Sequence, residues 1–399
     1  MKFDFTTIYD RRGKDAMAVD AVEKIPVFQP NEGFDAIPMW VADMNFATAP
    51  AVTEAIRKRL EHPLFGYFMT SDEYFDSIIR WQQRRNGVTG LENEHIGYEN
   101  GVLGGLMSAL AAVCARGDNV LVHSPTYIGF TRSIENGGYH VITSPLKPDR
   151  YGVQRMDFFD METKIKRNDI RAVVFCSPHN PTGRVWEQEE LEHFMDMVRR
   201  LNVTVISDEI WSDLTLRGHQ HIPLQSVSDD ARQRTVALYA PSKTFNLAGL
   251  IGSYHIVYNE ALHKRMKKES SLSHYNSMNV LSMHALIGAY SDEGSQWVDE
   301  LREVLTENVK YACKFIRKNL PGVSVQQPEG TYMLFLDCAA WLQEHHMTLR
   351  ELEERGARAG VIWQDGAAFA WPDSIRMNLA LPHSRLVEAM ERLRVHAFC

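Results

Sequence analysis

Residues 171–210 read RAVVFCSPHNPTGRVWEQEELEHFMDMVRRLNVTVISDEI. Two short runs rich in β-branched residues, 171–176 and 203–207, enclose a longer polar segment at 187–200. Within that segment, apolar residues recur at the i, i+3, i+4 and i+7 spacing of a helix packed on a sheet, and they are Leu191, Phe194, Met195 and Val198. Strand, helix and strand in this order predict a parallel sheet of the α/β class with helices on both faces.

Similar strand-like runs lie on either side, at residues 119–123 and 235–239. Each of the four runs ends in a polar or Gly/Pro-rich corner. The corners are His123-Ser124-Pro125-Thr126-Tyr127, Ser177-Pro178-His179-Asn180-Pro181, Asp208-Glu209 and Ala240-Pro241-Ser242-Lys243. Because ligands of open α/β sheets bind outside the carboxyl ends of the strands, we expect these corners to meet at one site.

The last hundred residues follow another pattern. A long amphipathic helix is predicted over 297–320, ended by Pro321-Gly322. After it comes a strand, helix and strand pattern at 331–337, 349–359 and 375–380, followed by a final helix. These elements indicate a second, smaller α+β domain.

Composition excludes several classes of protein. Of the 399 residues, 44% are apolar and 24% are charged, which is typical of globular proteins and not of disordered or fibrous chains. The net charge of −8 argues against nucleic acid and anionic membranes as partners and favours a small molecule. No run of 18 apolar residues and no signal-peptide pattern is found, so we expect a cytoplasmic protein.

Metal sites and disulfides are not expected either. The five cysteines are scattered and include no CxxC pair, which argues against a disulfide framework or a zinc ribbon. His219-Gln220-His221 has the spacing of two ligands, but it lies in a polar loop without a third. We therefore predict no metal centre.

Four residues at the strand ends match the needs of a pyridine aldehyde cofactor. Taken singly, Lys243 could be a surface lysine, Asp208 a helix cap, Asn180 a turn residue and Tyr127 a core residue. Together they supply an amine for a Schiff base, a carboxylate for the ring nitrogen, an amide for the phenolic oxygen and a flat partner for the ring. The set predicts pyridoxal phosphate as cofactor.

A phosphate site is predicted at residues 100–105, where the sequence NGVLGG opens an apolar helix. Backbone N–H groups at a helix N-terminus bind phosphate, and the hydroxyl of Ser242 can assist. This glycine stretch lacks the GxGxxG spacing and no nucleotide-binding strand precedes it, which disfavours a nicotinamide dehydrogenase.

Several motifs resemble those of the fold type I pyridoxal phosphate enzymes, the aspartate aminotransferase superfamily. Within it, the chain is most similar to the MalY/PatB-type bacterial cystathionine β-lyases and cystalysins, over nearly its whole length. The motifs lie at 39–46 (MWVADMNF), 65–67 (FGY), 124–127 (SPTY), 176–186 (CSPHNPTGRVW), 207–210 (SDEI), 240–249 (APSKTFNLAG), 329–332 (EGTY) and 376–380 (RMNLA). The resemblance implies a three-layer, mostly parallel large domain over 48–290, a small C-terminal domain over 291–399, and an N-terminal arm over 1–47 that is partly joined to the small domain.

The resemblance also implies residue roles. Lys243 would carry the cofactor, Asp208 would pair with the pyridine nitrogen, Asn180 would bond the phenolic oxygen, and Tyr127 would stack on the ring. The phosphate would be held by three residues of this chain and one of a neighbouring subunit, which implies a homodimer with shared active sites; these are Val102, Leu103 and Ser242, and Tyr67 from the neighbour.

Substrate binding is assigned to residues nearer the C-terminus. Arg376 would grip the α-carboxylate of an amino acid as a bidentate fork, helped by the backbone near Ala42, and Asn180 is also assigned to substrate binding. Tyr332 and Trp211 would border the substrate side chain, in a pocket without a second arginine motif for a distal carboxylate.

Two departures from the family stand out. Many aminotransferases carry a phosphate-binding arginine about eight residues after the lysine, whereas residues 250–252 here are Leu, Ile and Gly. This absence is usual among the β-lyases. Trp211 replaces the His or Tyr of relatives, and its indole nitrogen can donate a hydrogen bond but cannot accept one.

The sequence therefore predicts a C–S β-lyase that cleaves L-cystathionine or related S-substituted cysteines to a thiol, pyruvate and ammonia. A fold type I aminotransferase is the alternative, because the two reactions share most of their residues. A regulatory binding protein on the same fold is the third hypothesis, and the presence of Lys243, Asp208 and Arg376 argues against it.

Overall fold

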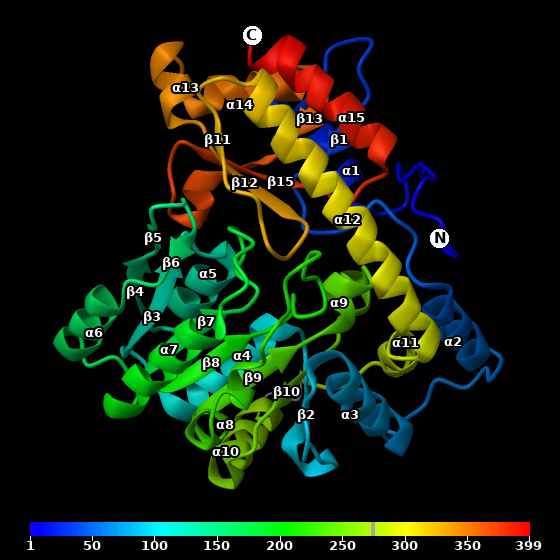
Figure 1. The fold of residues 1–399 in the computed structure, drawn as a ribbon. Helices are drawn as coiled ribbons and strands as arrows, with labels where there is room; N and C mark the ends of the chain where they lie inside the picture. Colours follow the sequence, from blue (N-terminus) through cyan, green and yellow to red (C-terminus); the bar gives the residue numbers. More distant parts are fainter. Residues whose placement is uncertain (273–275) are drawn as a thin grey trace.

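The structure is a computed structural model that describes residues 1–272 and 276–399. A seven-stranded sheet forms its larger part, with the order β2-β10-β9-β8-β7-β3-β4 (Figure 1). Strands β9, β8, β7, β3 and β4 are parallel, whereas β10 runs antiparallel to both of its neighbours. The strands are β2 (Ile96–Glu99), β3 (Asn119–Ser124), β4 (His140–Pro145), β7 (Ala172–Cys176), β8 (Thr204–Asp208), β9 (Thr235–Tyr239) and β10 (Ser253–Ile256).

Helices cover both faces of this sheet, as the strand sequences require. All five residues of β7 are buried: Val173 and Phe175 pack on one face, and Ala172, Val174 and Cys176 pack on the other. One face is covered by α4 (Val102–Val113), α5 (Ile128–Asn136) and α10 (Glu260–Ser271). The opposite face is covered by α6 (Phe158–Arg167), α7 (Gln188–Arg200) and α8 (Asp229–Arg234). The predicted three-layer, mostly parallel α/β architecture is confirmed.

A second sheet of four antiparallel strands lies above the first in Figure 1, in the order β11-β12-β15-β14. Its strands are β11 (Ser324–Val325), β12 (Met333–Asp337), β14 (Gln364–Asp365) and β15 (Ser374–Asn378). Around it are α12 (Asp292–Asn319), α13 (Ala339–Glu344), α14 (Leu349–Arg358) and α15 (His383–Arg392). The predicted strand, helix and strand pattern of the last hundred residues corresponds to β12, α14 and β15.

The N-terminal part of the chain contacts the second sheet and its helices. The short strand β1 (Ile37–Pro38) pairs in parallel with β13 (Val361–Ile362), far along the sequence. Other elements of the structure are α1 (Met17–Asp20), α2 (Pro50–Leu60), α3 (Asp72–Asn86), β5 (Lys147–Pro148), β6 (Gln154–Arg155), α9 (Pro241–Thr244) and α11 (Val280–Ala289). The β1–β13 pairing supports an arm that joins the C-terminal part, although the boundaries 1–47, 48–290 and 291–399 stay predictions.

One helix boundary differs from its prediction. The long helix α12 begins at Asp292, ahead of the Trp297 that the apolar period indicated. Its first turn is polar and carries no apolar period, and the Ser291 side chain caps it by accepting from the Gly294 backbone N–H. Within the described residues, no helix is both long and apolar enough to cross a membrane.

Candidate active site

The carboxyl ends of the parallel strands open into a cavity of about 320 Å³. The structure brings the four predicted corner residues together here, because β3, β7 and β8 end at the same edge and α9 starts after β9. Most of the predicted site residues line the cavity, namely Ala42, Val102, Leu103, Tyr127, Asn180, Asp208, Trp211, Ser242 and Lys243.

Asp208, the last residue of β8, lies buried at the base of the cavity with 5% of its surface exposed. Burial raises the pKa of its carboxyl to about 7. The backbone N–H of Ile210 donates to Oδ1 at 3.0 Å, and the charge of Lys243 also favours the ionised form, but neither offsets burial. A cation placed against this carboxylate, such as a protonated ring nitrogen, would stabilise its charge.

Lys243 lies in α9, the short helix after β9, and its side chain enters the cavity. Its Nζ donates a hydrogen bond of 2.9 Å to the backbone carbonyl of Ala42. Burial, and then the nearby positive charge of Arg376, lower the pKa of this amine to about 8. A substantial fraction of the amine is therefore neutral near physiological pH, as a nucleophile or a base requires.

Arg376, in the middle of β15, is buried, and its hydrogen-bond acceptors within residues 1–272 and 276–399 are neutral. Its Nη1 donates to Oδ1 of Asn180 at 3.0 Å, and its Nη2 donates to Oε1 of Gln364 at 2.6 Å and to the Trp40 carbonyl at 3.3 Å. Its Nε is buried without a partner among the described residues, and burial lowers the guanidinium pKa to about 10. A buried cation with an unused donor fits an anionic ligand, and its fork geometry suits a carboxylate.

The predicted phosphate end lies at the N-terminus of α4. Gly101 precedes this helix with φ of 81°, a conformation that favours glycine, and no side chain caps the helix start. The backbone N–H groups of the first turn therefore remain available to an anion. Ile251 and Gly252 also line the cavity, close to the position where many relatives would carry an arginine.

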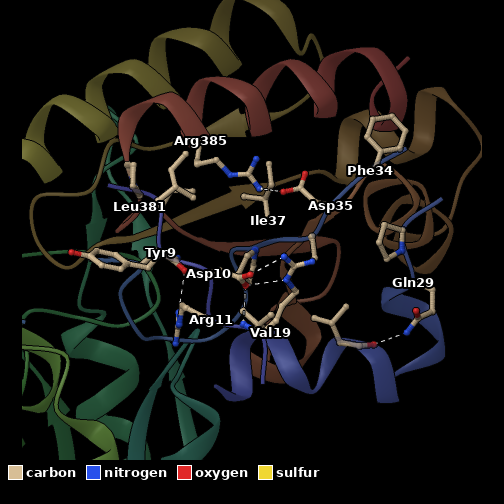
Figure 2. Close-up of a pocket in the computed structure, with 18 residues that line it drawn as sticks. Tyr9, Asp10, Arg11, Val19, Gln29, Phe34, Asp35, Ile37, Leu381 and Arg385 are labelled. Carbon is tan, nitrogen blue, oxygen red and sulfur yellow. Dashed lines mark hydrogen bonds and ion pairs between the residues drawn. The ribbon is translucent and has the colours of Figure 1, made fainter. Parts of the chain in front are cut away.

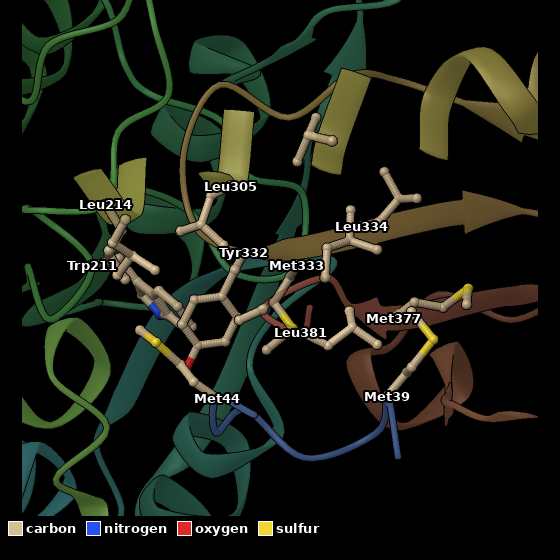
Figure 3. Packing of buried hydrophobic residues seen from close by; sticks show 14 of the residues in the cluster. Met39, Met44, Trp211, Leu214, Leu305, Tyr332, Met333, Leu334, Met377 and Leu381 are labelled. Atoms are coloured by element: carbon tan, nitrogen blue, oxygen red, sulfur yellow. The ribbon is translucent and has the colours of Figure 1, made fainter. Parts of the chain in front are cut away.

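Aromatic side chains form the walls. Tyr127 is the N-cap residue of α5 and lines the cavity, as does Trp211. Trp211 lies 5.8 Å from Lys243 Nζ, measured to the ring centre, and meets Tyr332 edge to face at 4.7 Å between ring centres (Figure 3). The Tyr332 hydroxyl donates to the Ala42 carbonyl at 3.0 Å, so Tyr332 reaches the site through the same oxygen that binds Lys243.

Some predicted residues lie elsewhere. Tyr67 is fully exposed and is absent from the lining of its own chain's cavity. The His221 ring is buried, with Nε2 at 2.7 Å from Glu209, and no cluster of metal-ligand side chains occurs in the described part of the chain.

Sequence reasoning missed two contacts of the site. Gln364 faces Arg376 across the β14–β15 pair and accepts its hydrogen bond, but a lone glutamine in a two-residue strand carries no sequence signal. Asn246 exchanges hydrogen bonds with the backbone of Met44, and only its place in the motif after Lys243 could have indicated it.

Comparison with known proteins identifies relatives of the whole chain. Cystathionine beta-lyase PatB of Bacillus subtilis is 36% identical over 365 residues, covering 90% of this chain and 92% of PatB. The pyridoxal-phosphate-bound C–S lyase of Staphylococcus hominis superposes with a TM-score of 0.90 at 30% identity, covering 100% of this chain and 98% of the lyase.

Cystalysin of Treponema denticola, whose structure contains pyridoxal 5'-phosphate, superposes with a TM-score of 0.92 at 29% identity, covering 99% of this chain and 98% of cystalysin. The family described as Aminotransferase class I and II matches residues 36–393. With these similarities beside a cavity that gathers the predicted lysine, aspartate and asparagine, the chain belongs to the aminotransferase class I and II family.

Proposed function

We propose that this protein is a pyridoxal-phosphate-dependent C–S β-lyase that acts on L-cystathionine or related S-substituted cysteines. The observation that carries the proposal is one cavity holding a buried amine, Lys243, and a buried carboxylate, Asp208, with the buried guanidinium of Arg376 behind Asn180. Relatives of the whole chain named as C–S lyases support the choice of reaction.

The cavity fits pyridoxal phosphate by the chemistry of its donors. Asp208 has no strong partner for its charge and would be stabilised by a pyridinium N–H. Asn180 uses Oδ1 to accept from Arg376, which leaves its amide N–H groups to donate to a phenolic oxygen. The uncapped start of α4 would take the phosphate, with Ser242 beside it.

When bound, this cofactor supplies an aldehyde that links to amines and an electron-withdrawing ring that acidifies Cα of the substrate. The chain supplies the remaining parts of the reaction. Arg376 would bind the α-carboxylate and fix the orientation of Cα, while Asp208 would keep the ring nitrogen protonated. The amine of Lys243, whose pKa of about 8 keeps it partly neutral, would remove the Cα proton at Nζ.

The surroundings of the substrate side chain favour sulfur. Trp211 and Tyr332 contact each other within a buried apolar cluster that includes Met44 and Leu214 (Figure 3). Thioether and disulfide groups pack well against aromatic rings, and a thiolate leaves readily from Cβ. Aspartate or glutamate would need a cation for its distal carboxylate.

The test is a direct comparison of two reactions on the purified protein with added cofactor. Pyruvate release from L-cystathionine, L-cysteine and S-alkyl cysteines is measured against keto-acid-dependent amino transfer from aspartate, alanine and phenylalanine. We expect lyase specificity to exceed transamination by at least tenfold, about 1.4 kcal/mol. If transamination of any common amino acid is faster than pyruvate release, the lyase assignment is wrong and the protein is an aminotransferase.

An aminotransferase is the second candidate, because the matching family is described by that activity and the acid, base and carboxylate groups would serve both reactions. The two differ in what would follow removal of the Cα proton: a lyase would expel the thiolate from Cβ, whereas an aminotransferase would return the proton to the cofactor. Among the described residues that line the cavity, Lys243 carries the one side-chain amine, so the same Nζ would serve either outcome. The comparison of rates above separates them.

We further propose a homodimer with shared sites, supported by a cluster of exposed apolar residues around Tyr67. Side chains of Leu64, Phe65, Tyr67 and Met69 are between 57% and 111% exposed, which is unusual for a contiguous stretch of a monomer. Light scattering and mixing of Lys243→Ala with Tyr67→Ala subunits test it. If sites are shared, the mixed dimers regain activity at one site.

A cytoplasmic location is proposed on separate grounds. All five cysteines carry free thiols, and three of them are buried in the core, as expected of a chain that folds in a reducing compartment. We also propose that the units 48–290 and 291–399 are domains, since each contains its own sheet.

A further inference from the structure

An irregular segment, residues 40–45, contacts both cationic groups of the candidate site, Lys243 and Arg376. The Ala42 carbonyl accepts hydrogen bonds from Lys243 Nζ at 2.9 Å and from the Tyr332 hydroxyl at 3.0 Å. The Trp40 carbonyl accepts from Arg376 Nη2 at 3.3 Å. The position of this backbone therefore decides where the lysine amine lies.

Side chains of the site anchor the segment from the inner side. Asn378, two residues after Arg376, donates from Nδ2 to the Val41 carbonyl at 2.8 Å and also to the Asp43 carbonyl. Asn246 accepts from the Met44 N–H at 2.9 Å and donates to the Met44 carbonyl at 3.0 Å. These contacts leave the Asp43 side chain directed away from them, toward the N-terminal arm.

Arg11 anchors the same segment from the outer side. Its Nη2 forms an ion pair of 2.6 Å with Asp43 Oδ2, and its Nη1 donates to Asn45 Oδ1 at 3.0 Å. Both side chains of the ion pair are about one-fifth exposed. Arg11 and Asn45 also lie in the wall of a separate pocket of about 490 Å³, between the N-terminal arm and Leu381 and Arg385 (Figure 2).

The ion pair is electrostatically connected to the lysine. The charged groups that act on Lys243 are Arg376, which lowers the pKa of the amine, and Asp43 and Asp208, which raise it. The Tyr332 hydroxyl and the Trp211 ring, which also face the amine, are uncharged at neutral pH. Of the two carboxylates, Asp43 has an arginine in contact, and by Coulomb's law a charge of opposite sign beside a carboxylate opposes the field of that carboxylate.

We propose that Arg11 is a positioning residue for Lys243: through its ion pair with Asp43 it holds the Ala42 carbonyl against the amine and neutralises a carboxylate that would otherwise keep the amine protonated. The inference rests on the proposed function only in taking Lys243 as the base. Its contacts, and the charge balance at the amine, are independent of which reaction the enzyme performs.

The test measures the amine itself in the full-length protein without cofactor. Pulse labelling with acetic anhydride over a pH series, with mass spectrometry of the Lys243 peptide, gives the pKa of the amine. In Arg11→Gln the uncompensated carboxylate of Asp43 should raise it, slowing labelling at neutral pH roughly threefold, which is half a pKa unit. In Asp43→Asn the uncompensated Arg11 should lower it, and labelling should accelerate by a similar factor.

The double variant Arg11→Gln/Asp43→Asn should return close to the wild-type pKa, because both charges are gone. A purely structural role would shift both single variants in the same direction. Arg12→Gln is the matched control, since Arg12 pairs with Asp10 and has a side chain 74% exposed, and it should leave the labelling unchanged. Arg11→Lys keeps the positive charge, so the pKa of the Lys243 amine should stay closer to the wild-type value than it does in Arg11→Gln.

Parallel shifts of the two single variants, or equal shifts for Arg11→Gln and Arg12→Gln, would overturn the proposal. In the holoenzyme, Arg11→Gln should lower kcat at neutral pH more than it raises KM, with the rising limb of the kcat–pH profile moved to higher pH. Because the labelling needs neither cofactor nor substrate, its failure is distinguishable from a failure of the proposed lyase activity.

Discussion

Asp208 and Glu209 are neighbours in the chain but belong to two different kinds of buried site. Asp208 faces the cavity and receives one hydrogen bond, from the Ile210 backbone. Glu209 is fully buried outside the cavity lining, and both of its carboxylate oxygens have hydrogen-bond partners. Its partners are Ser207 Oγ and the Leu224 N–H at Oε1, and His221 Nε2 and the Tyr239 hydroxyl at Oε2.

The comparison separates structural from ligand-binding polar groups. A buried carboxylate with four protein partners needs nothing more and stabilises the fold by joining several elements. A buried carboxylate with a single hydrogen-bond donor, in a site that also includes a buried guanidinium with an unused N–H, leaves charges that a bound molecule can satisfy. Asp208 and Asn180 line the cavity at the strand ends, and Arg376 lies behind Asn180 and donates to its Oδ1.

The largest effect on activity is expected from substitution of Arg376, one of the buried charged groups that lack a full set of protein partners. Arg376→Ala should weaken kcat/KM for every amino acid substrate alike, by roughly 2 to 5 kcal/mol, because a desolvated carboxylate loses its partner. Steady-state kinetics on several substrates checks the uniformity. Arg385→Ala, which removes an arginine paired with Asp35 away from the cavity, is the control and should change little. A loss of kcat/KM confined to one substrate would mean that Arg376 binds the side chain of that substrate and not the α-carboxylate.

Next in size is Asp208→Asn. The substitution keeps the shape and removes the charge that would hold the ring proton, so turnover should fall about a hundredfold or more while cofactor still binds. Turnover and the visible absorbance of the bound cofactor are measured together. Near-normal turnover would mean that another group keeps the ring nitrogen protonated.

Glu209→Gln tests the other member of the pair. It should lower the free energy of unfolding by about 2 to 3 kcal/mol, because the buried His221 and Tyr239 contacts are disturbed. The measurement is urea unfolding of the cofactor-free protein. Turnover per folded molecule should stay within a few-fold of wild type. A loss of turnover without a loss of stability would contradict a structural role for Glu209.

The smallest effect is a pH dependence of stability. The pKa of Asp208 is raised to about 7 from 3.8, so the folded protein binds this proton more tightly than the unfolded chain does. The resulting stability is fully present below 3.8 and is lost as the pH rises through about 7. Cofactor-free Asp208→Asn should therefore match wild type at low pH and exceed its stability above neutral pH, by roughly 1 to 3 kcal/mol.

Urea unfolding of both proteins at several pH values checks this prediction. Adding cofactor should remove the advantage of the variant, because a ring cation would then offset the charge of wild-type Asp208. A difference that is constant with pH would show that Asp208 does not titrate in this range.

Much of this arrangement was predictable from regular patterns. The alternating faces of β7, the period of α7 and the polar corners at the strand ends carry their signal locally, so the sheet and the meeting of Tyr127, Asn180, Asp208 and Lys243 were expected. The resemblance to fold type I enzymes then assigned Arg376, on a strand of another sheet, to the same site, and the structure brings it into contact with Asn180.

What the sequence could not predict lies in irregular backbone. The segment 40–45 has no helix or strand period, so its contacts with Lys243 and Arg376 follow only from the folded structure. The same holds for Arg11, which meets Asp43 across a sequence distance of 32 residues. The contact of Gln364 with Arg376 follows only from the pairing of β14 with β15, which the sequence did not predict.

We expect the cavity at the strand ends to bind pyridoxal phosphate on Lys243. Borohydride reduction of the purified, cofactor-loaded protein, followed by peptide mass spectrometry, tests it most directly. We predict a reduced pyridoxyl group on the peptide that contains Lys243 and on no other, and its absence from Lys243→Ala. A label on a different lysine, or an unlabelled wild-type protein after loading, would show that Lys243 does not carry the cofactor.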